Sequence, residues 1–498
     1  MPPTVDQSGT RESSDLGTTC KQGIGLMRSG GYVGQSGQKR VCMCVFNNFT
    51  HDSRVLKEAS SLVQEGYSVT VLARLDDQTL PRESINGITV KRLCSDPLHL
   101  KLIDLIRNIS LKKFFLNNVK IRGHGKDRIA ANAGSSESPM RINSVMLKNL
   151  YNSVTHGIRY VASKAHSGLK NALVSSLMSF NRPLVILDFN YRIVMSTRGQ
   201  SYDVFHAHDL NTLMGAYVAA KKQGAKLIYD SHELYLERNR FEPYDRVGKW
   251  MRKKVEAYLI RRCDYVITVN DSLARMLADT YKVKLPTVVM NTPSLAAVSP
   301  PSDYRSLRRA IGIPDDYAIL LYSGSITFNR GLENLIEALV YLPKCFLVLM
   351  GYSHDSYENK LRTIAQKKGV ASRLAFFGPV PSSEVTLYAS SADLGVAPIE
   401  NVCLSYYYCS PNKLFEYLLA GLPVIASDFP EMRQIIDEYG VGSTFDPSAS
   451  GDIARAVTDI LEAPEKWKDM KKKTDALASA YNWEKESRKL THIYGSLP

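Results

Sequence analysis

The chain has 498 residues, of which 44% are hydrophobic and 22% are charged, and its formal net charge at pH 7 is +14. This composition is typical of a globular protein and argues against a disordered or membrane-embedded chain. The length favours two or three domains, and no apolar segment approaches the roughly 20 residues that a membrane-spanning helix requires.

The first 38 residues are rich in Ser, Thr and Gly and contain no continuous apolar segment. We expect a disordered tail over residues 1–38, without a secretory signal. The chain has eight cysteines and no C-x-x-C pair. Cys42 and Cys44 would face the same side of a strand, which favours packing over metal binding, so we expect a reducing, cytoplasmic environment.

From residue 39 onward, short apolar segments alternate with amphipathic helical stretches such as 52–66. Strands are predicted in the first half at 40–46, 67–73, 88–93, 202–208, 225–231 and 264–269. Nearly continuous apolar strands separated by helices indicate a parallel, doubly wound sheet. The sequence therefore predicts a Rossmann-like domain over residues 39–300.

A basic insertion, at about residues 98–200, interrupts this first domain. Its second part has apolar residues at roughly helical spacing, namely Val145, Leu147, Leu150, Val154 and Ile158. A basic amphipathic helix can lie on an anionic membrane surface, or it can be a lid whose apolar stripe packs on its own domain. Both alternatives stay open, whereas nucleic acid is not expected because zinc-finger spacing and RNA-recognition signatures are lacking.

The alternation pauses at a Pro- and Ser-rich linker near residues 291–314 and then resumes. Strands are predicted at 317–325, 345–353, 374–380, 393–399 and 422–428, with a clear helix at 330–342. We expect a second Rossmann-like domain over 315–482 and a final helix over 483–498. Ligands of open parallel sheets bind beyond the carboxyl ends of the strands, so two such domains would face each other across a ligand-binding cleft.

Two strand-to-helix junctions in the second half are suited to phosphate. In "YSGSITFNRGLENLIEAL", Gly324 and Gly331 allow close approach of the backbone to a ligand, and Arg330 can bind phosphate through two nitrogens. This junction alone is also compatible with an ordinary turn, because it has neither Walker nor G-x-G-x-x-G spacing.

The second junction is "SPNKLFEYLLAG", in which Asn412 is predicted to cap a helix. Lys413 in the first turn opposes the helix dipole, so a bound anion would explain its position. Glu416 can accept hydrogen bonds from the vicinal hydroxyls of a ribose. Two cationic junctions in one domain suggest a nucleoside diphosphate.

In the first half, polar residues cluster after three predicted strands. The candidates for acceptor binding are Asn47, Asp52, Arg54, His208, Asp209 and Glu233, with His232 beside them. His and Asp can ligate zinc, but one histidine with one carboxylate at a strand end is commoner in acceptor sites. We therefore predict no metal site, and an ordinary hydrogen-bonded strand end stays open as the alternative for any single histidine.

These motifs carry a resemblance to a known family. The second half is similar to the nucleotide-sugar domain of retaining GT-B glycosyltransferases, the group that includes the phosphatidylinositol mannosyltransferases. The resemblance is strongest in "YSGSITFNRGLENLIEAL", "SADLGVAP" and "SPNKLFEYLLAGLPVIASDFPEMRQII". It implies a GT-B fold, a nucleoside-diphosphate sugar as co-substrate without cofactor or metal, and a final helix that crosses back to the first domain.

The resemblance also implies roles for single residues. Arg330 falls where the family has a basic residue on the donor diphosphate, and Glu416 matches the second glutamate of its E-x7-E motif, which binds ribose. The first glutamate of that motif is replaced by Tyr408, so the chain departs from the pattern, and Asn412 with Lys413 resembles a subset of the family. His232 falls near a sugar- or phosphate-contacting histidine, which makes His232 and Glu416 the candidate catalytic residues.

We therefore expect a retaining glycosyltransferase of polysaccharide or cell-envelope synthesis, acting on a glycan or lipid-linked acceptor. The membrane reading of the basic insertion would place it peripherally on the inner face of the membrane. Two rival hypotheses stay open. Nucleotide-sugar 2-epimerases share the fold, and a non-catalytic scaffold would retain the fold and bind membrane or partners.

Overall fold

The computed structural model describes residues 38–94, 97–108, 170–175, 178, 181–240, 244–295 and 304–497. From Lys39 onward, the described residues form one compact unit. The predicted disordered tail lies outside the described residues, apart from Gln38. The predicted amphipathic helix of the basic insertion, from Val145 to Ile158, also lies outside them.

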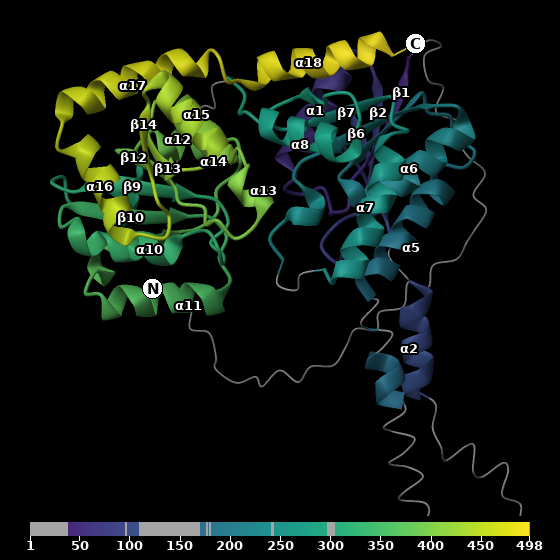
Figure 1. Ribbon diagram of the computed structural model, residues 1–498, viewed down its shortest axis with the longest axis horizontal. Helices are drawn as coiled ribbons and strands as arrows, with labels where there is room; N and C mark the ends of the chain where they lie inside the picture. Colours follow the sequence, from purple (N-terminus) through teal and green to yellow (C-terminus); the bar gives the residue numbers. More distant parts are fainter. Residues whose placement is uncertain are drawn as a thin grey trace, which may run out of the picture. The chain divides into compact units, whose positions relative to one another are not determined.

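The first sheet has eight strands in the order β3-β4-β2-β1-β5-β6-β7-β8 (Figure 1). The strands are β1 (Arg40–Cys44), β2 (Ser68–Arg74), β3 (Arg82–Ile85), β4 (Ile88–Leu93), β5 (Val204–His208), β6 (Lys226–Ser231), β7 (Tyr265–Thr268) and β8 (Thr287–Val288). All neighbours are parallel except β3, which is antiparallel to β4. Because the strand order reverses at β1, a topological switch point lies between β1 and β5.

Helices cover both faces of this sheet. They are α1 (Ser53–Gln64), α5 (Asn181–Ser196), α6 (Leu210–Gln223), α7 (Arg246–Ile260), α8 (Asp271–Tyr281) and α18 (Trp483–Ser496), with the short helix η1 (Tyr235–Glu237). The helix α2 (Leu98–Asn108) follows β4 and contributes no residue to the two core clusters of this sheet. Alternate residues of β1 point to opposite faces: Val41 and Met43 pack with α1 and α18, whereas Cys42 and Cys44 pack with α5, α6, α7 and α8.

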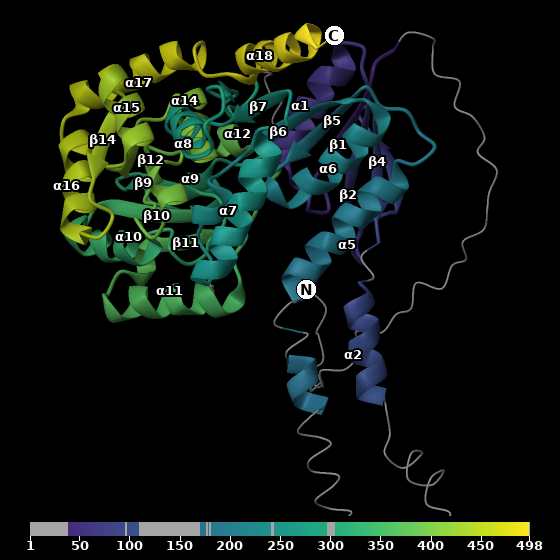
Figure 2. The same cartoon turned by 45° about the vertical axis from the view of Figure 1, so that its right-hand side comes forward.

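The helix α18 follows the second sheet in the chain but packs on α1 (Figures 1 and 2). Trp483 donates a hydrogen bond from Nε1 to the hydroxyl of Ser61 at 2.9 Å. Tyr494 lies buried on the same face of the first sheet and contacts His206. The last turns of the chain therefore complete the core of the first sheet.

The second sheet has six parallel strands in the order β11-β10-β9-β12-β13-β14. They are β9 (Ala318–Ser323), β10 (Cys345–Met350), β11 (Leu374–Phe377), β12 (Leu394–Ala397), β13 (Val424–Ser427) and β14 (Gly442–Phe445). The order reverses at β9, so a second switch point lies between β9 and β12. Loops that follow β9 and β12 are thus placed to bind a ligand.

Helices cover both faces of the second sheet as well. They are α9 (Leu307–Ile311), α10 (Leu332–Ala338), α11 (Asp355–Lys367), α12 (Val385–Ala389), α13 (Leu404–Tyr407), α14 (Asn412–Leu419), α15 (Pro430–Tyr439), α16 (Ser450–Leu461) and α17 (Pro464–Ala478), with η2 (Leu339–Tyr341) and η3 (Ala371–Arg373). One face packs against α10, α11 and α16, and the other packs against α12, α14 and α15.

The predicted fold class is confirmed, because the chain forms two doubly wound α/β sheets. Every segment predicted as a strand contains one in the structure. The prediction did not include β3, β8 and β14, which are a polar edge strand, a two-residue strand and "GSTF". Among the described helices, none combines the length and apolar character that crossing a bilayer requires.

Candidate functional site

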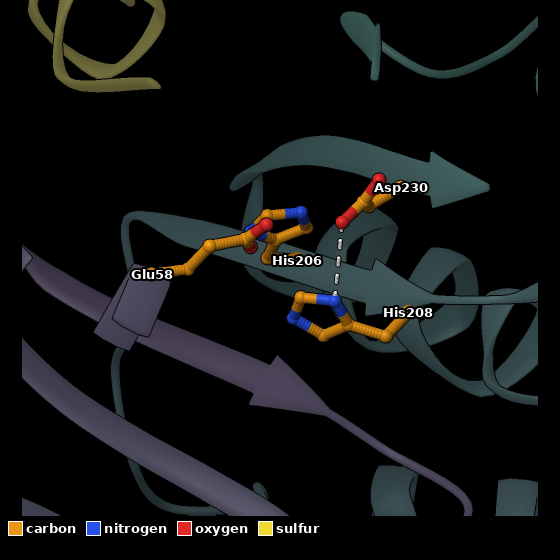
Figure 3. Close-up of side chains that lie close together, drawn as sticks. All are labelled: Glu58, His206, His208 and Asp230. Atoms are coloured by element: carbon orange, nitrogen blue, oxygen red, sulfur yellow. Dashed lines mark ion pairs between the residues drawn. The ribbon is translucent and has the colours of Figure 1, made fainter. Parts of the chain in front are cut away.

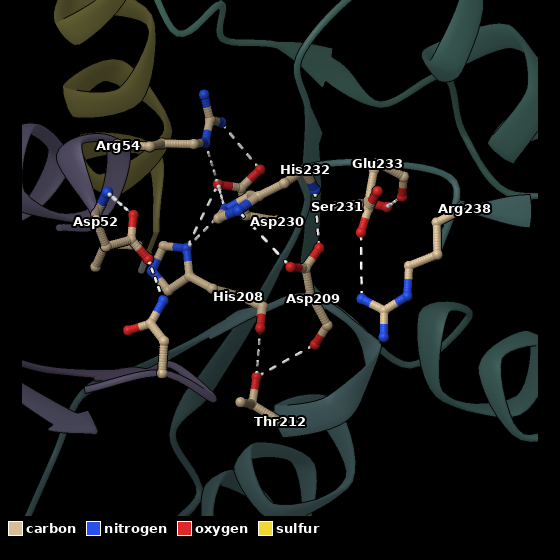
Figure 4. Close-up of polar contacts among 12 residues, drawn as sticks. Asp52, Arg54, His208, Asp209, Thr212, Asp230, Ser231, His232, Glu233 and Arg238 are labelled. Atoms are coloured by element: carbon tan, nitrogen blue, oxygen red, sulfur yellow. Dashed lines mark hydrogen bonds and ion pairs between the residues drawn. The ribbon is translucent and has the colours of Figure 1, made fainter. Parts of the chain in front are cut away.

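A buried ion-pair network lies at the carboxyl ends of β5 and β6 (Figure 4). Arg54, in the first turn of α1, donates to both carboxylate oxygens of Asp230, from Nε at 2.8 Å and from Nη2 at 3.0 Å. Its Nη1 donates to the carbonyl of Val289 at 2.7 Å. Asp230 is fully buried, and although burial raises the pKa of a carboxyl, the charges of Arg54 and His232 hold the pKa of Asp230 well below its usual range.

His232 joins this network at its solvent-accessible edge, with a side chain that is 21% exposed. Its Nε2 lies 3.0 Å from Asp230 Oδ2, and its backbone N–H donates to Asp209 Oδ1 at 3.1 Å. Burial lowers the pKa of His232, but the charges of Asp230 and Asp209 outweigh this and raise it to about 10. His232 is therefore an imidazolium at neutral pH and can donate a hydrogen bond to a ligand.

Two further histidines lie behind His232. His208 Nδ1 lies 3.2 Å from His232 Nε2, and the rings of His206 and His208 are stacked with centroids 4.3 Å apart. His206 Nδ1 lies 2.9 Å from the hydroxyl of Tyr494 on α18. Burial lowers the pKa of both His206 and His208, so the two imidazoles are neutral and the positive charge stays on His232.

Glu58, His206, His208 and Asp230 could share an ion, because one ligand atom of each lies within 4.8 Å of the others (Figure 3). Arg54 Nε, however, lies 3.0 Å from Glu58 and 2.8 Å from Asp230. A divalent cation here would be repelled by this guanidinium. Burial raises the pKa of Glu58 to about 8, and both of its carboxyl oxygens lack a hydrogen-bond partner among the described residues. The guanidinium therefore pairs chiefly with Asp230, and we interpret the group as part of the buried network around Arg54.

The loop after β1 holds a second polar group. Asp52 caps α1 by accepting from the backbone N–H of Val55, and Asn47 donates to the other oxygen of Asp52 at 2.7 Å. Asp209 follows β5, at the N-cap position of α6, with a φ of 62°, an uncommon conformation for a non-glycine residue, often found at functional sites. Glu233 is turned toward Arg238 at 3.2 Å.

A pocket of about 460 Å³ brings these groups together with residues of the second half. It is lined by Asn47, Asn48, His51, Asp52, Ser53, Arg54, His232, Val269, Asn291, Ser410 and Asn412. Of the residues predicted to bind acceptor, Asn47, Asp52 and Arg54 lie in this lining. His208 and Asp209 contact His232 on its inner side, and Glu233 forms an ion pair with Arg238 outside this lining. The sequence analysis missed His51 and Asn291, which have no motif around them, and Ser410, which begins the quoted segment "SPNKLFEYLLAG" but was given no role.

The second switch point holds two cations without a carboxylate. Lys413 is only 8% exposed, and its Nζ lies 3.4 Å from the centre of the Tyr322 ring. The Arg330 guanidinium lies over the ring of Tyr406 at 4.8 Å, and its buried Nε has no hydrogen-bond partner. Burial and the nearby charge of Arg330 lower the pKa of Lys413 well below its usual range. Within the described part of the chain, neither cation has an ion-pair partner.

Two glycines make room for this pair of cations. Gly324 follows β9 with a φ of 122°, and a Cβ there would lie 3.4 Å from Lys413 Nζ. Gly331 follows Arg330 with a φ of 68°, and a Cβ there would lie 2.0 Å from the carbonyl oxygen of Pro398. A side chain at position 331 would therefore displace the backbone that carries Arg330.

Glu416 lies one turn after Lys413 on α14 and is half-buried. Burial raises its pKa, while the charges of Lys413 and Lys57 act against that rise. The prediction that Asn412 caps this helix is wrong, because α14 begins at Asn412 and its N-cap is Pro411. Proline has no backbone N–H, so nothing is left without a partner at this position. The Asn412 side chain does not cap the helix but lines the 460 Å³ pocket.

Tyr408, which replaces the first glutamate of the family motif, ends α13. Its carbonyl accepts a hydrogen bond from the side chain of Asn270 at 2.8 Å. Glu400, the nearest upstream acid, lines a separate pocket of about 650 Å³ beyond β12, β13 and β14, together with Asp428 and Asp446. Tyr408 thus supplies a backbone contact at this position.

Comparisons with known proteins agree with this architecture. Residues 303–476 match the family model described as glycosyl transferases group 1, and residues 162–292 match that of glycosyltransferase family 4. Between them, the two matches take in strands of both sheets. The second half of the chain is thus similar to the group 1 glycosyltransferases, and the match in the first half is to a glycosyltransferase family as well.

Among the relatives of this glycosyltransferase is D-inositol 3-phosphate glycosyltransferase 2 of Catenulispora acidiphila, 23% identical over 68% of this chain and 79% of that protein. Another is the putative glycosyltransferase EpsD of Bacillus subtilis, 25% identical over 59% of this chain and 77% of that protein.

Solved structures with the same fold include two with nearly complete coverage of both chains. Sucrose-phosphate synthase of Thermosynechococcus elongatus has a TM-score of 0.65 and 17% identity, and covers 92% of this chain and 99% of its own. Anabaena Alr3699/HepE in complex with UDP and glucose has a TM-score of 0.60 and 15% identity, and covers 92% and 100%. These likenesses confirm the GT-B fold.

Proposed function

We propose that this glycosyltransferase uses a nucleoside-diphosphate sugar, and that Arg330 and Lys413 bind the diphosphate. The observation that carries the proposal is the pair of cations at the second switch point, both without a carboxylate partner. A buried ammonium is costly unless an anion pairs with it. A diphosphate would supply that anion, and Arg330 can bind phosphate oxygens through two nitrogens.

The rest of the donor would lie along α14 and the loops after β9 and β12. Glu416, one turn after Lys413, is suited to accept hydrogen bonds from the two ribose hydroxyls. Anabaena Alr3699/HepE has the same fold and is solved with UDP and with UDP-glucose, which makes a UDP-sugar the first donor to test. The proposed binding residues are therefore Gly324, Arg330, Gly331, Asn412, Lys413 and Glu416.

The acceptor, a glycan or lipid-linked glycan, would occupy the 460 Å³ pocket. Asn47 and Asp52 offer amide and carboxylate groups of the kind that bind sugar hydroxyls, and His232 offers a charged donor. The pocket also contains Ser410 and Asn412, immediately before Lys413 on the chain. An acceptor there would therefore lie next to the proposed diphosphate site.

We propose transfer with retention, for which this arrangement would need no protein nucleophile. The acceptor oxygen forms a bond to the anomeric carbon on the face from which the diphosphate leaves, and the bond from that carbon to the phosphate oxygen breaks. The acceptor proton passes to the departing diphosphate. Arg330 and Lys413 would stabilise the negative charge that develops there, and His232 would orient the sugar.

Two further parts of the proposal concern divalent metal ions and the membrane. We expect no divalent metal to take part, since the two cations would perform its electrostatic role, and activity in EDTA tests this. The basic insertion would hold the enzyme peripherally on an anionic membrane, close to a lipid-linked acceptor.

The donor proposal can be tested by thermal unfolding with UDP, GDP, dTDP and ADP. A nucleotide at 100 times its Kd should stabilise the protein by about 2.7 kcal/mol. Arg330→Ala with Lys413→Ala should abolish the shift. The matched control is Lys367→Ala with Lys368→Ala, which removes the same charge from α11 and should leave the shift intact.

Several outcomes would overturn the proposal. If no nucleotide stabilises the wild-type protein, the nucleotide reading fails and a scaffold becomes the better interpretation. If the control pair loses the shift equally, binding reflects overall charge and Arg330 and Lys413 have no special role. Conversion of the donor into an epimerised sugar without any acceptor would identify a 2-epimerase, and the anomeric configuration of a transfer product, seen by NMR, decides retention.

A further inference from the structure

The helix α18 places a buried tyrosine against the histidines of the first switch point. Tyr494 is fully buried, and its ring packs edge-on against that of Tyr67, with centroids 5.5 Å apart. Its hydroxyl lies 2.9 Å from His206 Nδ1, which is its one hydrogen-bond partner among the described residues. Burial raises the pKa of this hydroxyl well above its usual range, so Tyr494 keeps its proton at neutral pH and needs an acceptor.

This contact determines which nitrogen of His206 carries a proton. His206 is neutral because burial lowers its pKa, so one ring nitrogen donates and the other accepts. If the proton were on Nδ1, the hydroxyl of Tyr494 would have no acceptor. The arrangement that satisfies both groups has Tyr494 donating to Nδ1, with the His206 proton on Nε2.

The proton of His208 is determined from the opposite side (Figure 4). His208 Nδ1 lies 3.2 Å from His232 Nε2, which in turn lies 3.0 Å from Asp230 Oδ2. The distance from His208 Nδ1 to Asp230 is 3.5 Å, which is long for a hydrogen bond. Because both nitrogens of the His232 imidazolium carry protons, a proton on His208 Nδ1 would face another proton. His208 therefore carries its proton on Nε2 and offers the lone pair of Nδ1 to His232.

The two neutral histidines are coupled through their rings. His206 and His208 are two positions apart on β5, so both point to the same face of the sheet, and their rings stack with centroids 4.3 Å apart and 28° between the planes. Their Nε2 atoms and both carboxyl oxygens of Glu58 are buried without a hydrogen-bond partner, and the side chains lie close together (Figure 3). In so closely packed a group, a turn of the His206 ring would displace His208.

We propose that Tyr494 is a positioning residue for His232 and acts through His206 and His208. The Tyr494 hydroxyl fixes the tautomer and the orientation of His206, and the stacked rings fix His208. His208 Nδ1 then accepts a hydrogen bond from His232. The helix α18 thus sets the orientation of the charged histidine that lines the 460 Å³ pocket.

The arrangement of the histidines does not depend on the donor proposal. Its effect on transfer rests on the proposed function, in which His232 orients the sugar. Besides His208, four charged or titratable groups act on His232, namely Arg54, Glu58, Asp209 and Asp230. Replacing Tyr494 by phenylalanine leaves all four in place, so a changed titration of His232 would report on His208.

The test is NMR of the full chain with ¹⁵N-labelled histidine, in which His232→Gln identifies the signal of His232. In the wild-type protein, His232 should titrate near pH 10, and His206 should show the shifts of the tautomer with its proton on Nε2. In Tyr494→Phe, His232 should titrate about one unit lower, because a hydrogen bond to the charged imidazolium weakens. The signals of His206 should then show a mixture of both tautomers.

The matched control is Tyr67→Phe, which removes a hydroxyl from the partner ring of Tyr494 but outside the group of histidines. It should leave the titration of His232 unchanged. A second variant removes the same hydrogen bond from its other end, because His206→Phe keeps a ring in the stack but cannot accept from Tyr494. It should shift the titration of His232 as much as Tyr494→Phe does, and the two changes together should shift it no further.

Once a donor is identified, the reaction rate gives a second readout. The pH at which kcat/KM falls on the alkaline side should move down by about one unit in Tyr494→Phe, while stabilisation by nucleotide stays unchanged. A failure of the donor proposal would remove this second readout and leave the NMR result intact, so the two failures are distinguishable.

Three results would overturn the inference. The first is a titration of His232 that is the same in the wild-type protein, Tyr494→Phe and His206→Phe. The second is an equal shift in Tyr67→Phe, which would indicate a general effect of packing around α18. The third is an additional shift when Tyr494→Phe is combined with His206→Phe, which would mean that Tyr494 acts by another route. If Tyr494→Phe loses its cooperative unfolding transition in urea, His206→Phe with the Tyr67→Phe control decides, and an unchanged titration of His232 there overturns the inference.

Discussion

The two switch points of the molecule differ in whether their buried cations are paired with carboxylates. At the first, Arg54 lies between Asp230 and Glu58 and makes a bidentate contact with Asp230. At the second, Arg330 and Lys413 lie against the rings of Tyr406 and Tyr322, without an ion-pair partner among the described residues. At the first switch point the buried arginine is thus paired with a carboxylate, whereas at the second the lysine and the arginine form no ion pair with any described residue.

This difference indicates which half binds the more highly charged substrate. The bidentate ion pair of Arg54 and Asp230 is satisfied and holds both side chains rigid, which suits the positioning of neutral sugar hydroxyls, whereas Glu58, His206 and His208 beside it keep buried atoms without hydrogen-bond partners. Partially buried cations without partners leave the free protein less stable, and they are explained if an anionic ligand neutralises them. The comparison therefore supports the proposal that the diphosphate binds at the second sheet, and each prediction below tests one side of the comparison.

The largest effect is expected from removing the unpaired cations. Each lost group that stabilises developing charge costs about 10²–10³ in rate. Arg330→Ala with Lys413→Ala should therefore lower kcat/KM by about 10⁴-fold, measured with the nucleotide sugar that the thermal unfolding identifies. A decrease of less than tenfold would contradict the role of the second switch point.

The next effect concerns the first switch point and is one of stability. Arg54→Met would leave Asp230 buried without its guanidinium, and breaking a buried ion pair in this way costs about 3–5 kcal/mol. Urea unfolding should show this loss. Arg330→Met is the matched control and should cost less than about 1 kcal/mol, because no carboxylate loses a partner; equal losses would mean that the two switch points do not differ.

A pH-dependent effect of intermediate size is expected at His232. Its pKa is raised from about 6.5 to about 10 by Asp230 and Asp209, despite its burial. The stability from this charge is fully present below pH 6.5 and is lost as the pH rises through 10. One pKa unit corresponds to about 1.4 kcal/mol, and partial exposure screens the interaction, so His232→Gln should cost about 2 kcal/mol at pH 6.

This difference should shrink as the pH is raised and vanish above about pH 10, when His232 is neutral in the wild-type protein as well. Thermal unfolding of both proteins across this range measures it. His492→Gln, on the exposed side of α18, is the control and should show no such trend. A constant difference at every pH would mean that His232 acts through packing alone.

How far the sequence could predict this molecule differs between fold and site. The strands β1, β5, β9 and β10 are apolar segments bounded by turns, so their type and parallel order could be inferred. The polar strand β3 and the two-residue β8 carry too little apolar surface for any periodicity to show. Pro411, rather than Asn412, caps α14, which a cap preference based on residue type alone does not distinguish.

Within the site, the sequence located the residues next to motifs and missed those that come together by folding. Arg54 and Asp230 are 176 positions apart, and nothing local links them. Glu58 is buried beside Arg54 because α1 turns both inward, although four-residue spacing of opposite charges usually indicates a surface pair. Ser410 and Asn291 share a pocket only through the packing of two sheets.

The smallest effect is expected from replacing Lys413 in the absence of nucleotide. This replacement should stabilise the protein, whereas the replacement of Arg54 should destabilise it. Burial and Arg330 lower the pKa of Lys413, so the charged form destabilises the fold at pH values below the ordinary lysine pKa of about 10.4. Lys413→Met should therefore raise the thermal stability of the free protein, by about 1 kcal/mol, while abolishing stabilisation by nucleotide. The gain should vanish above about pH 10.5 and grow as the pH is lowered from there. A loss of stability would instead show that the contact with the Tyr322 ring outweighs the cost of burying the charge, and the second switch point would then be satisfied without a ligand.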